Sequence, residues 1–212
     1  MVGLDALATV LGSSPNQSEI QTLLTQIGAS STVDPDIKAY PDVVYHNYQP
    51  LGLSLQYEAA NARTDASKAP ADDLRLAAID IYSAHEDKRW TGCPGLPLQI
   101  SANHVETGGK TVEAIITHDS TGKDLVSLLG EPDRKGGGAG GRSGPAAWME
   151  WSLRLSSPGS GSRAAKQVKL QIELAGAGAR GADRWNAERA GACPWAVITV
   201  SWHVTQSQRK II

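Results

Sequence analysis

A strict alternation of apolar and polar residues is the feature that most limits what this chain can fold into. Residues 168–174 read Val-Lys-Leu-Gln-Ile-Glu-Leu, and residues 51–57 follow the same period of two. Successive side chains of a β-strand point to opposite faces, so each segment predicts a strand with one buried and one solvated face. Sheets with one solvated face are typically antiparallel. The alternation therefore predicts an antiparallel sheet lying on a core.

Other segments add strands and short helices to this sheet. Strands are expected at residues 43–48, 74–82, 148–155 and 195–202, and helices at 4–11, 19–27 and 123–129. Ser18 and Thr121 are predicted to cap the second and third helices, which end at Gly28 and Gly130. Pro50-Leu51-Gly52 predicts a tight connection between two strands of a hairpin.

Segments rich in Gly, Ala, Ser and Pro separate these elements and are expected to be loops. They cover residues 59–73, 83–100, 135–147, 156–166 and 175–194. The run of glycines at 136–141 lacks the lysine and the strand-to-helix context of a phosphate-binding loop. We therefore interpret it as a flexible insertion.

The order of elements repeats along the chain. A short helix, a turn and a strand with two aromatic residues three apart occur twice, and Tyr45 and Tyr48 correspond to Trp148 and Trp151. The repeat divides the chain into a first half at 1–100 and a second half at 101–212 with Gly-rich insertions, and the two halves are expected to form one compact unit. The predicted fold class is α+β, with an antiparallel sheet built from two similar helix-then-strands halves and helices packed on one face.

One segment carries a resemblance to known families. Residues 121–133, Thr-Gly-Lys-Asp-Leu-Val-Ser-Leu-Leu-Gly-Glu-Pro-Asp, followed by Trp148-Met149-Glu150-Trp151, are similar to a helix-then-strand signature. It resembles the small lipoproteins of the outer-membrane assembly machinery and the β-lactamase-inhibitor-protein fold, which contains two such units in tandem. The chain departs from those families in lacking a lipobox cysteine, a signal peptide and paired cysteines. The resemblance implies a binding or scaffolding fold and no chemistry.

The net charge and the absence of targeting signals limit the classes of partner and the cellular location that the sequence predicts. The formal net charge is −2, without the basic excess that binding to a phosphate backbone requires, so nucleic acid is not expected as a partner. No secretory signal and no transmembrane segment is recognised, so a cytoplasmic or nuclear location away from the membrane is expected. Cys93 and Cys193 are then expected to be free, buried thiols.

Catalytic signatures are weak. His85-Glu86-Asp87 and His118-Asp119 have residue types that bind zinc or iron, but they lie in polar segments where solvated side chains are common. No Gly-x-Ser-x-Gly nucleophile motif is found. The sequence therefore predicts no enzyme, no bound cofactor and no metal. The alternative that stays open is a hydrolase or metal-dependent enzyme with a site assembled from scattered His, Asp and Glu residues.

The aromatic pairs carry the functional prediction. Because side chains alternate along a strand, two rings three residues apart point to opposite faces unless a bulge intervenes. Trp and Tyr dominate the anchors of protein interfaces. We therefore predict a binding or scaffold protein whose sheet face engages a protein partner, with Tyr45, Tyr48, Trp148 and Trp151 as candidate contact residues.

Overall fold

Strands dominate the molecule, which is known from a computed structural model that describes residues 1–29, 33–105, 109–137, 146–155, 166–182 and 184–202. Within these residues, eleven strands form one mixed sheet. The strands are β1 (Val2–Gly3), β2 (Asp36–Ala39), β3 (Val44–Tyr48), β4 (Leu53–Ala59), β5 (Leu74–Tyr82), β6 (Leu98–His104), β7 (Thr111–Ile116), β8 (Arg134–Gly136), β9 (Trp148–Leu155), β10 (Gln167–Leu174) and β11 (Trp195–Trp202). The α-helices are α1 (Leu4–Val10), α2 (Ser18–Ile27), α3 (Gly122–Leu129) and α4 (Ala187–Gly191).

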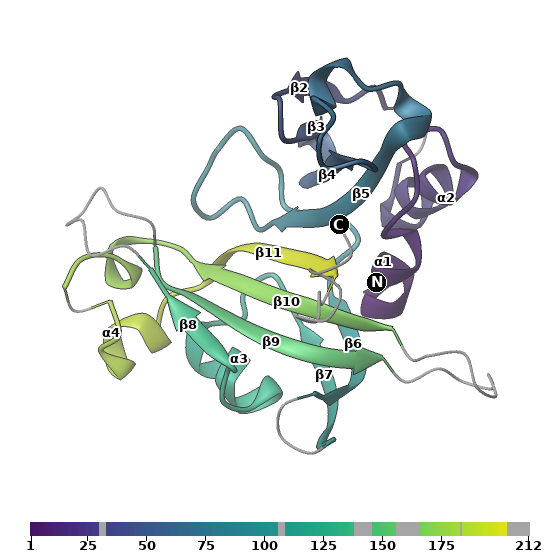
Figure 1. The fold of residues 1–212 in the computed structure, drawn as a ribbon. Helices are drawn as coiled ribbons and strands as arrows, with labels where there is room; N and C mark the ends of the chain where they lie inside the picture. The colour runs from purple at the N-terminus through teal and green to yellow at the C-terminus, as the bar shows by residue number, and fades with distance from the viewer. Residues whose placement is uncertain (30–32, 106–108, 138–145, 156–165, 183, 203–212) are drawn as a thin grey trace.

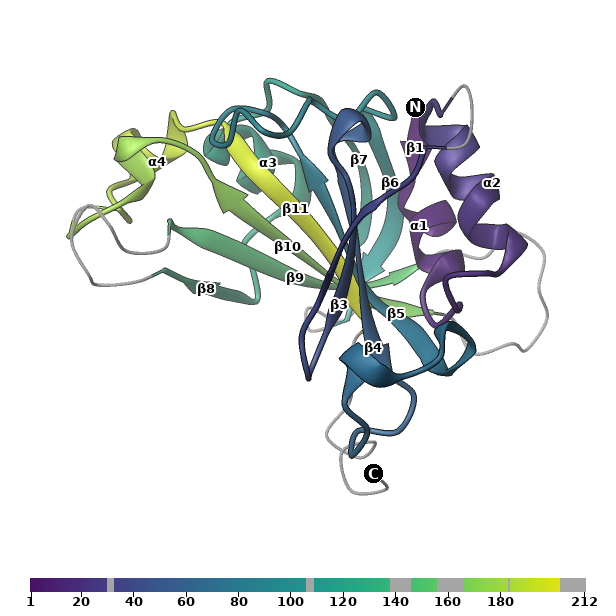
Figure 2. The same cartoon turned by 90° about the horizontal axis from the view of Figure 1, so that it is seen from above.

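The sheet is continuous from one edge to the other. Its strand order is β1-β6-β9-β10-β11-β5-β4-β3-β2, with β7 added to β6 and β8 added to β9. The pair β1–β6 is parallel, and the other pairs in the described residues are antiparallel. The sheet bends strongly between β11 and β5, so that β2 to β5 stand above β9 to β11 in Figure 1 and cross in front of them in Figure 2.

The predicted fold class is wrong. The helix-then-strands layout in two halves is replaced by one sheet-rich unit in which helices are few and short. β5 pairs directly with β11, so the sheet runs without interruption between the parts of the chain that were assigned to separate halves. β6 begins before residue 100 and pairs with β1, β7 and β9. The repeat pattern failed because local sequence specifies strands but not their partners, which lie far away along the chain.

The two faces of the sheet differ sharply in composition. On the apolar face, Trp151, Leu170, Val200, Ile79 and Leu55 lie side by side across five strands, and all are fully buried. These residues form a single core with buried residues of α1, α2 and α3. Burial of apolar area at about 25 cal/mol per Å² is the main stabilising contribution to such a core. The opposite face of the same strands carries mostly polar side chains.

Helix α3 follows the prediction closely. The Thr121 hydroxyl accepts from Asp124 N, and the Asp124 carboxylate accepts from Thr121 N at 2.9 Å, which is a capping box. Leu125 and Leu129, one turn apart, are buried against the core. The predicted cap at Ser18 is wrong, because Gln17 precedes α2 and its side chain accepts from Ser14 N instead of capping the helix.

Other local predictions have mixed outcomes. The hairpin is confirmed, since β3 and β4 pair from Tyr48↔Leu53 onward across the turn at 49–51. The free, buried state of Cys93 and Cys193 is also confirmed. Strands β1, β2, β6, β7 and β8 were not predicted, and α4 lies in a segment expected to be a loop. Most of the glycine-rich segment 135–147 and nearly all of 156–166 lie outside the described residues.

None of the helices in the described parts of the chain is both long enough and apolar enough to span a bilayer.

Candidate functional site

A row of polar residues crosses the second face of the sheet. Glu150, Gln171, Thr199, Asp80, Ser54 and Asn47 lie next to one another on β9, β10, β11, β5, β4 and β3. We call the side of the sheet that carries this row the polar face. The six residues of the row are buried or half-buried, unlike the exposed side chains of an ordinary solvated sheet face. None of these six residues belongs to the hydrophobic core.

The four predicted contact residues separate into two pairs. Trp151 and Tyr48 point to the apolar face and are buried, with Trp151 fully so. Trp148 and Tyr45 are half-buried and lie on the polar face, because each is an odd number of residues from its buried companion. The predicted opposite orientation within each pair is confirmed. Tyr45 and Trp148 lie on strands far apart in the order of the sheet.

Asp80 is a buried acid of the polar face that has no cation beside it among the described residues. Its side chain lies on the central strand β5, and the residue is 8% exposed. Thr199 Oγ1 donates to Oδ1 at 2.7 Å, and Gln56 Nε2 donates to Oδ2. Burial raises the pKa of Asp80, while the two hydrogen bonds oppose this rise. Within the described residues Asp80 forms no ion pair, so its charge is balanced only by neutral donors.

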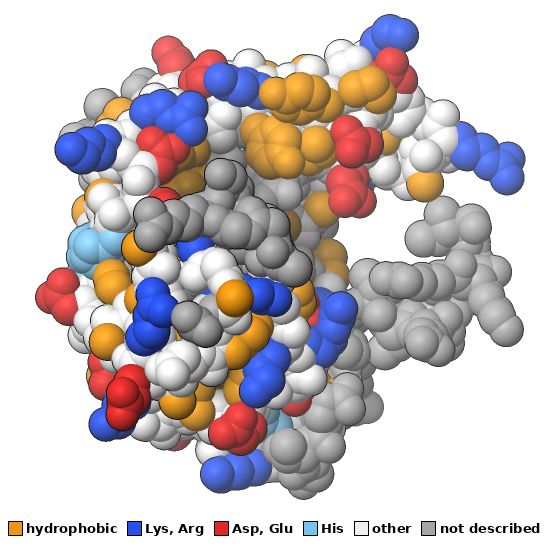
Figure 3. All heavy atoms as spheres, turned by 90° about the vertical axis from the view of Figure 1, so that its left-hand side faces the viewer, with side chains coloured by type: hydrophobic (Ala, Val, Ile, Leu, Met, Phe, Trp, Pro, Cys, Tyr) orange, Lys and Arg blue, Asp and Glu red, His pale blue; other side chains and the backbone are white. Residues whose placement is uncertain are grey.

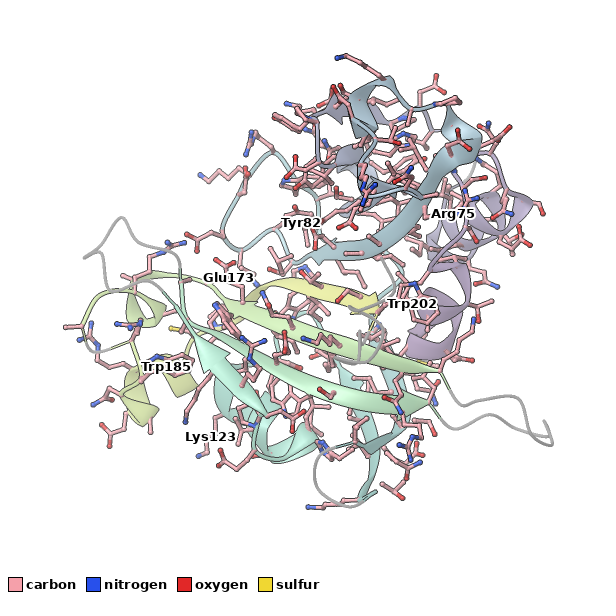
Figure 4. All side chains as sticks on the ribbon, in the orientation of Figure 1. Arg75, Tyr82, Lys123, Glu173, Trp185 and Trp202 are labelled. Carbon is pink, nitrogen blue, oxygen red and sulfur yellow. The ribbon has the colours of Figure 1, made fainter. Side chains whose placement is uncertain are left out.

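Glu173 is a second acid on the same face. It is half-buried on β10, and burial raises its pKa; the charge of Arg180 opposes this effect, and the charges of Glu86 and Asp80 add to it. Figure 4 shows Tyr82 of β5 and Glu173 at the same end of the sheet. The Tyr82 ring stacks on Trp90 with the ring centroids 3.8 Å apart. This end of the polar face therefore combines acidic and aromatic side chains.

The charge of Glu150, which lies on β9 where the polar row begins, is neutralised by two cations. Its Oε1 lies 3.2 Å from Lys169 Nζ and 3.3 Å from Arg134 Nη1. A buried carboxylate is stabilised when two cations share it. The acidic potential of the face is therefore concentrated at Asp80 and Glu173. Seen from the side, the upper part of the molecule carries acidic and basic side chains beside a group of hydrophobic ones (Figure 3).

A prediction about pH follows from the buried state of Asp80. Its pKa is higher in the folded protein than the value of about 3.9 in an unfolded chain. The stability that this group contributes is therefore complete below that unfolded value and is lost as the pH rises through the folded pKa. We expect Asp80→Asn, which keeps the shape without the charge, to be more stable than the wild type at pH 7. The advantage should disappear near pH 3.

Urea denaturation of both proteins between pH 3 and pH 8 measures this difference, and contributions of other groups cancel between them. A variant less stable than the wild type at pH 7 would contradict the prediction. That result would mean that the hydrogen bonds from Gln56 and Thr199 outweigh the cost of burying the charge.

A pocket lies away from the polar face, between α3 and α4. Its volume is about 310 Å³, and its walls include Val126, Met149 and Leu174. Lys123 and Trp185 stand at the pocket in the lower left of Figure 4. This volume is at the small end of ligand sites in proteins. The wall residues Met149 and Leu174 come from the apolar side of the sheet, so the pocket and the polar face are separate.

Sequence reasoning missed Asp80 and Glu173. The signal for Asp80 was its position inside the apolar segment Ala78-Ile79-Asp80-Ile81, where an acid needs partners to be buried. The sequence signal for Glu173 was its position among the polar residues of the alternating segment 168–174, which forms β10. Neither signal shows that β5 and β10 lie on either side of β11, which brings the two acids together.

Comparisons with known proteins add no family assignment. No family model, no curated protein and no solved structure matches this chain.

Proposed function

We propose that the protein is a non-catalytic binding module whose polar face engages a basic segment of a protein partner. The observation that carries this proposal is the pair of acids Asp80 and Glu173, which form no ion pair within the described residues and have raised pKa values. The buried Asp80 is balanced only by neutral donors, and the pKa of the half-buried Glu173 stays raised despite the charge of Arg180. Burying such carboxylates is costly, and a cation supplied by a partner would offset that cost.

Arginine fits this face better than lysine. A guanidinium donates two parallel hydrogen bonds to a carboxylate and stacks on aromatic rings. Tyr82, with its stacked neighbour Trp90, lies at the end of the sheet that carries Glu173. Trp148 already has Arg134 of its own chain 5.9 Å from its ring centroid, which is the kind of contact expected from a partner.

The half-buried rings support the same proposal. Tyr45 and Trp148 lie on the polar face, whereas their companions Tyr48 and Trp151 pack in the core. Tyr and Trp are the residues most often found at the centres of protein interfaces. A partner with a basic segment flanked by apolar residues would use both the acids and the rings.

Selection from a random peptide library displayed on phage tests the proposal even though the natural partner is unidentified. The wild type should enrich peptides rich in arginine. The double variant Asp80→Asn/Glu173→Gln should bind those peptides at least about tenfold more weakly, since one lost charge pair is worth about 1.4 kcal/mol or more at a desolvated site. Affinity for the wild type should also fall as salt is added.

The matched control is Asp5→Asn/Glu19→Gln, which removes the same charge from exposed residues of α1 and α2. It should bind the selected peptides as the wild type does. Equal binding by the two double variants, or enrichment of peptides without basic residues, would refute the proposal.

A further inference from the structure

Two histidines and an aspartate meet at one end of the sheet. His85 lies in the connection from β5 to β6, and His118 and Asp119 lie in the turn from β7 to α3. Each of the three offers a ligand atom, and these atoms lie within 4.8 Å of one another. The fold thus joins two histidine-containing segments that are far apart in the sequence.

His85 is held in an orientation suited to metal binding. Its Nδ1 lies 3.3 Å from the carbonyl oxygen of Trp195, the first residue of β11. A carbonyl accepts only, so this contact favours the tautomer with its proton on Nδ1 and a lone pair on Nε2. Histidines that bind metals typically donate their second ring nitrogen to a carbonyl or carboxylate in this way.

His118 is positioned by close packing. A Cβ atom built at Gly92 would lie 2.3 Å from its Nε2, so the ring lies directly against the backbone of the β5–β6 connection. The rings of His85 and His118 meet edge to face, with centroids 4.9 Å apart. With Nε2 against Gly92, the other nitrogen, Nδ1, lies 3.9 Å from Asp119 Oδ1. An ion between these two atoms would be bound by both of them.

We propose that His85, His118 and Asp119 bind a divalent transition-metal ion such as Zn²⁺. Two imidazoles and a carboxylate are donors that suit zinc, cobalt, nickel and copper more than magnesium or calcium. Ligand atoms of a tetrahedral site lie about 3.4 Å apart when the bonds are about 2.1 Å, so a small closure of the exposed His85 and Asp119 side chains completes the geometry. Three protein ligands leave a position for water or for a group of a partner.

The ion would tie two distant segments together. The β5–β6 connection and the β7–α3 turn are otherwise joined here by side-chain packing of His118. An ion that binds the folded chain and not the unfolded chain stabilises the fold by an amount that grows with the logarithm of its concentration above the dissociation constant. The site is separate from Asp80 and does not rest on the proposed function.

Isothermal titration of the untagged, EDTA-stripped protein with ZnCl₂ tests the site. We expect one ion per chain and an increase of the melting temperature when zinc is present. His85→Ala, His118→Ala and Asp119→Asn should each weaken zinc binding at least about 100-fold, because even a lost second-shell partner costs about 10- to 100-fold. Co²⁺ bound to the wild type should give visible d–d absorption bands that the histidine variants lack.

The control is His46→Gln, which removes a histidine of β3 whose ring packs at a tilt against Tyr57 and is not part of the cluster. It should bind zinc as the wild type does, and circular dichroism without metal checks that every variant is folded. Absence of stoichiometric binding to the wild type would overturn the proposal. So would unchanged binding by folded His85→Ala and His118→Ala, or loss of binding in Cys93→Ser alone. Asp80→Asn/Glu173→Gln should retain the ion, which separates this site from the proposed interface.

Discussion

Replacing Trp151 by alanine should lower the free energy of unfolding by about 3–5 kcal/mol, the range for removing a large aromatic side chain from a core. Trp151 is fully buried on the apolar face of β9. Its Nε1 also donates to the carbonyl oxygen of Gly130, just after α3, at 3.1 Å. The substitution therefore opens a cavity and leaves a helix-end carbonyl without its donor. Urea denaturation at neutral pH measures the loss.

The matched variant is Trp148→Ala on the same strand. Trp148 is half-buried on the polar face and packs over Gly136 of β8. We expect it to lose less than half the stability lost by Trp151→Ala, and to weaken binding of the arginine-rich peptides that the wild type selects. Equal losses of stability for the two variants would show that Trp148 belongs to the core, and its proposed role as a contact residue would then fail.

Replacing Gly52 by alanine should lower the free energy of unfolding by about 2–4 kcal/mol, from strain and crowding together. Gly52 has φ +53°, which side chains disfavour. A Cβ atom there would lie 2.3 Å from the carbonyl oxygen of Thr91 and 2.8 Å from Cys93 N. Backbone atoms cannot move aside alone, so the β5–β6 connection would have to shift. Thermal and urea unfolding measure the loss.

Gly176→Ala is the control for backbone strain. Gly176 has φ +82°, and a Cβ atom there would meet nothing within 4 Å. Its ψ is 175°, a region open almost only to glycine, so its loss should be about 1–3 kcal/mol, from conformation alone. A loss of only about 1 kcal/mol at Gly52, which its left-handed conformation alone would cause, would show that crowding against Thr91 and Cys93 contributes nothing and that the close approach at Gly52 is not needed for the fold.

Local patterns were reliable wherever a short segment contains its own physical cause. The Thr121–Asp124 capping box, the β3–β4 hairpin and the alternating strand β10 depend on residues that are neighbours in sequence. The opposite orientation of Trp148 and Trp151 follows from the geometry of any strand. Strand β2 was missed because its four residues are all exposed and show no apolar face.

The arrangement of strands was predicted wrongly because pairing is a long-range choice. β6 contacts β1 from the N-terminus, β7 next in sequence and β9 much later in the chain. β5 has β4 on one side and β11 on the other. Several strands of similar pattern compete for each edge, and only the packing of the complete core selects among them.

The amino-acid sequence by itself determined the strands β3, β4, β5, β9, β10 and β11, which side of each of these strands is buried, and where α3 begins. These properties depend on alternation and capping, which act over a few residues. Only the tertiary structure decided that Asp80 and Glu173 share one face and that His85 meets His118 and Asp119. Both groupings bring together residues from distant segments, and their proximity depends on strand order and on the bend of the sheet, which no local pattern encodes.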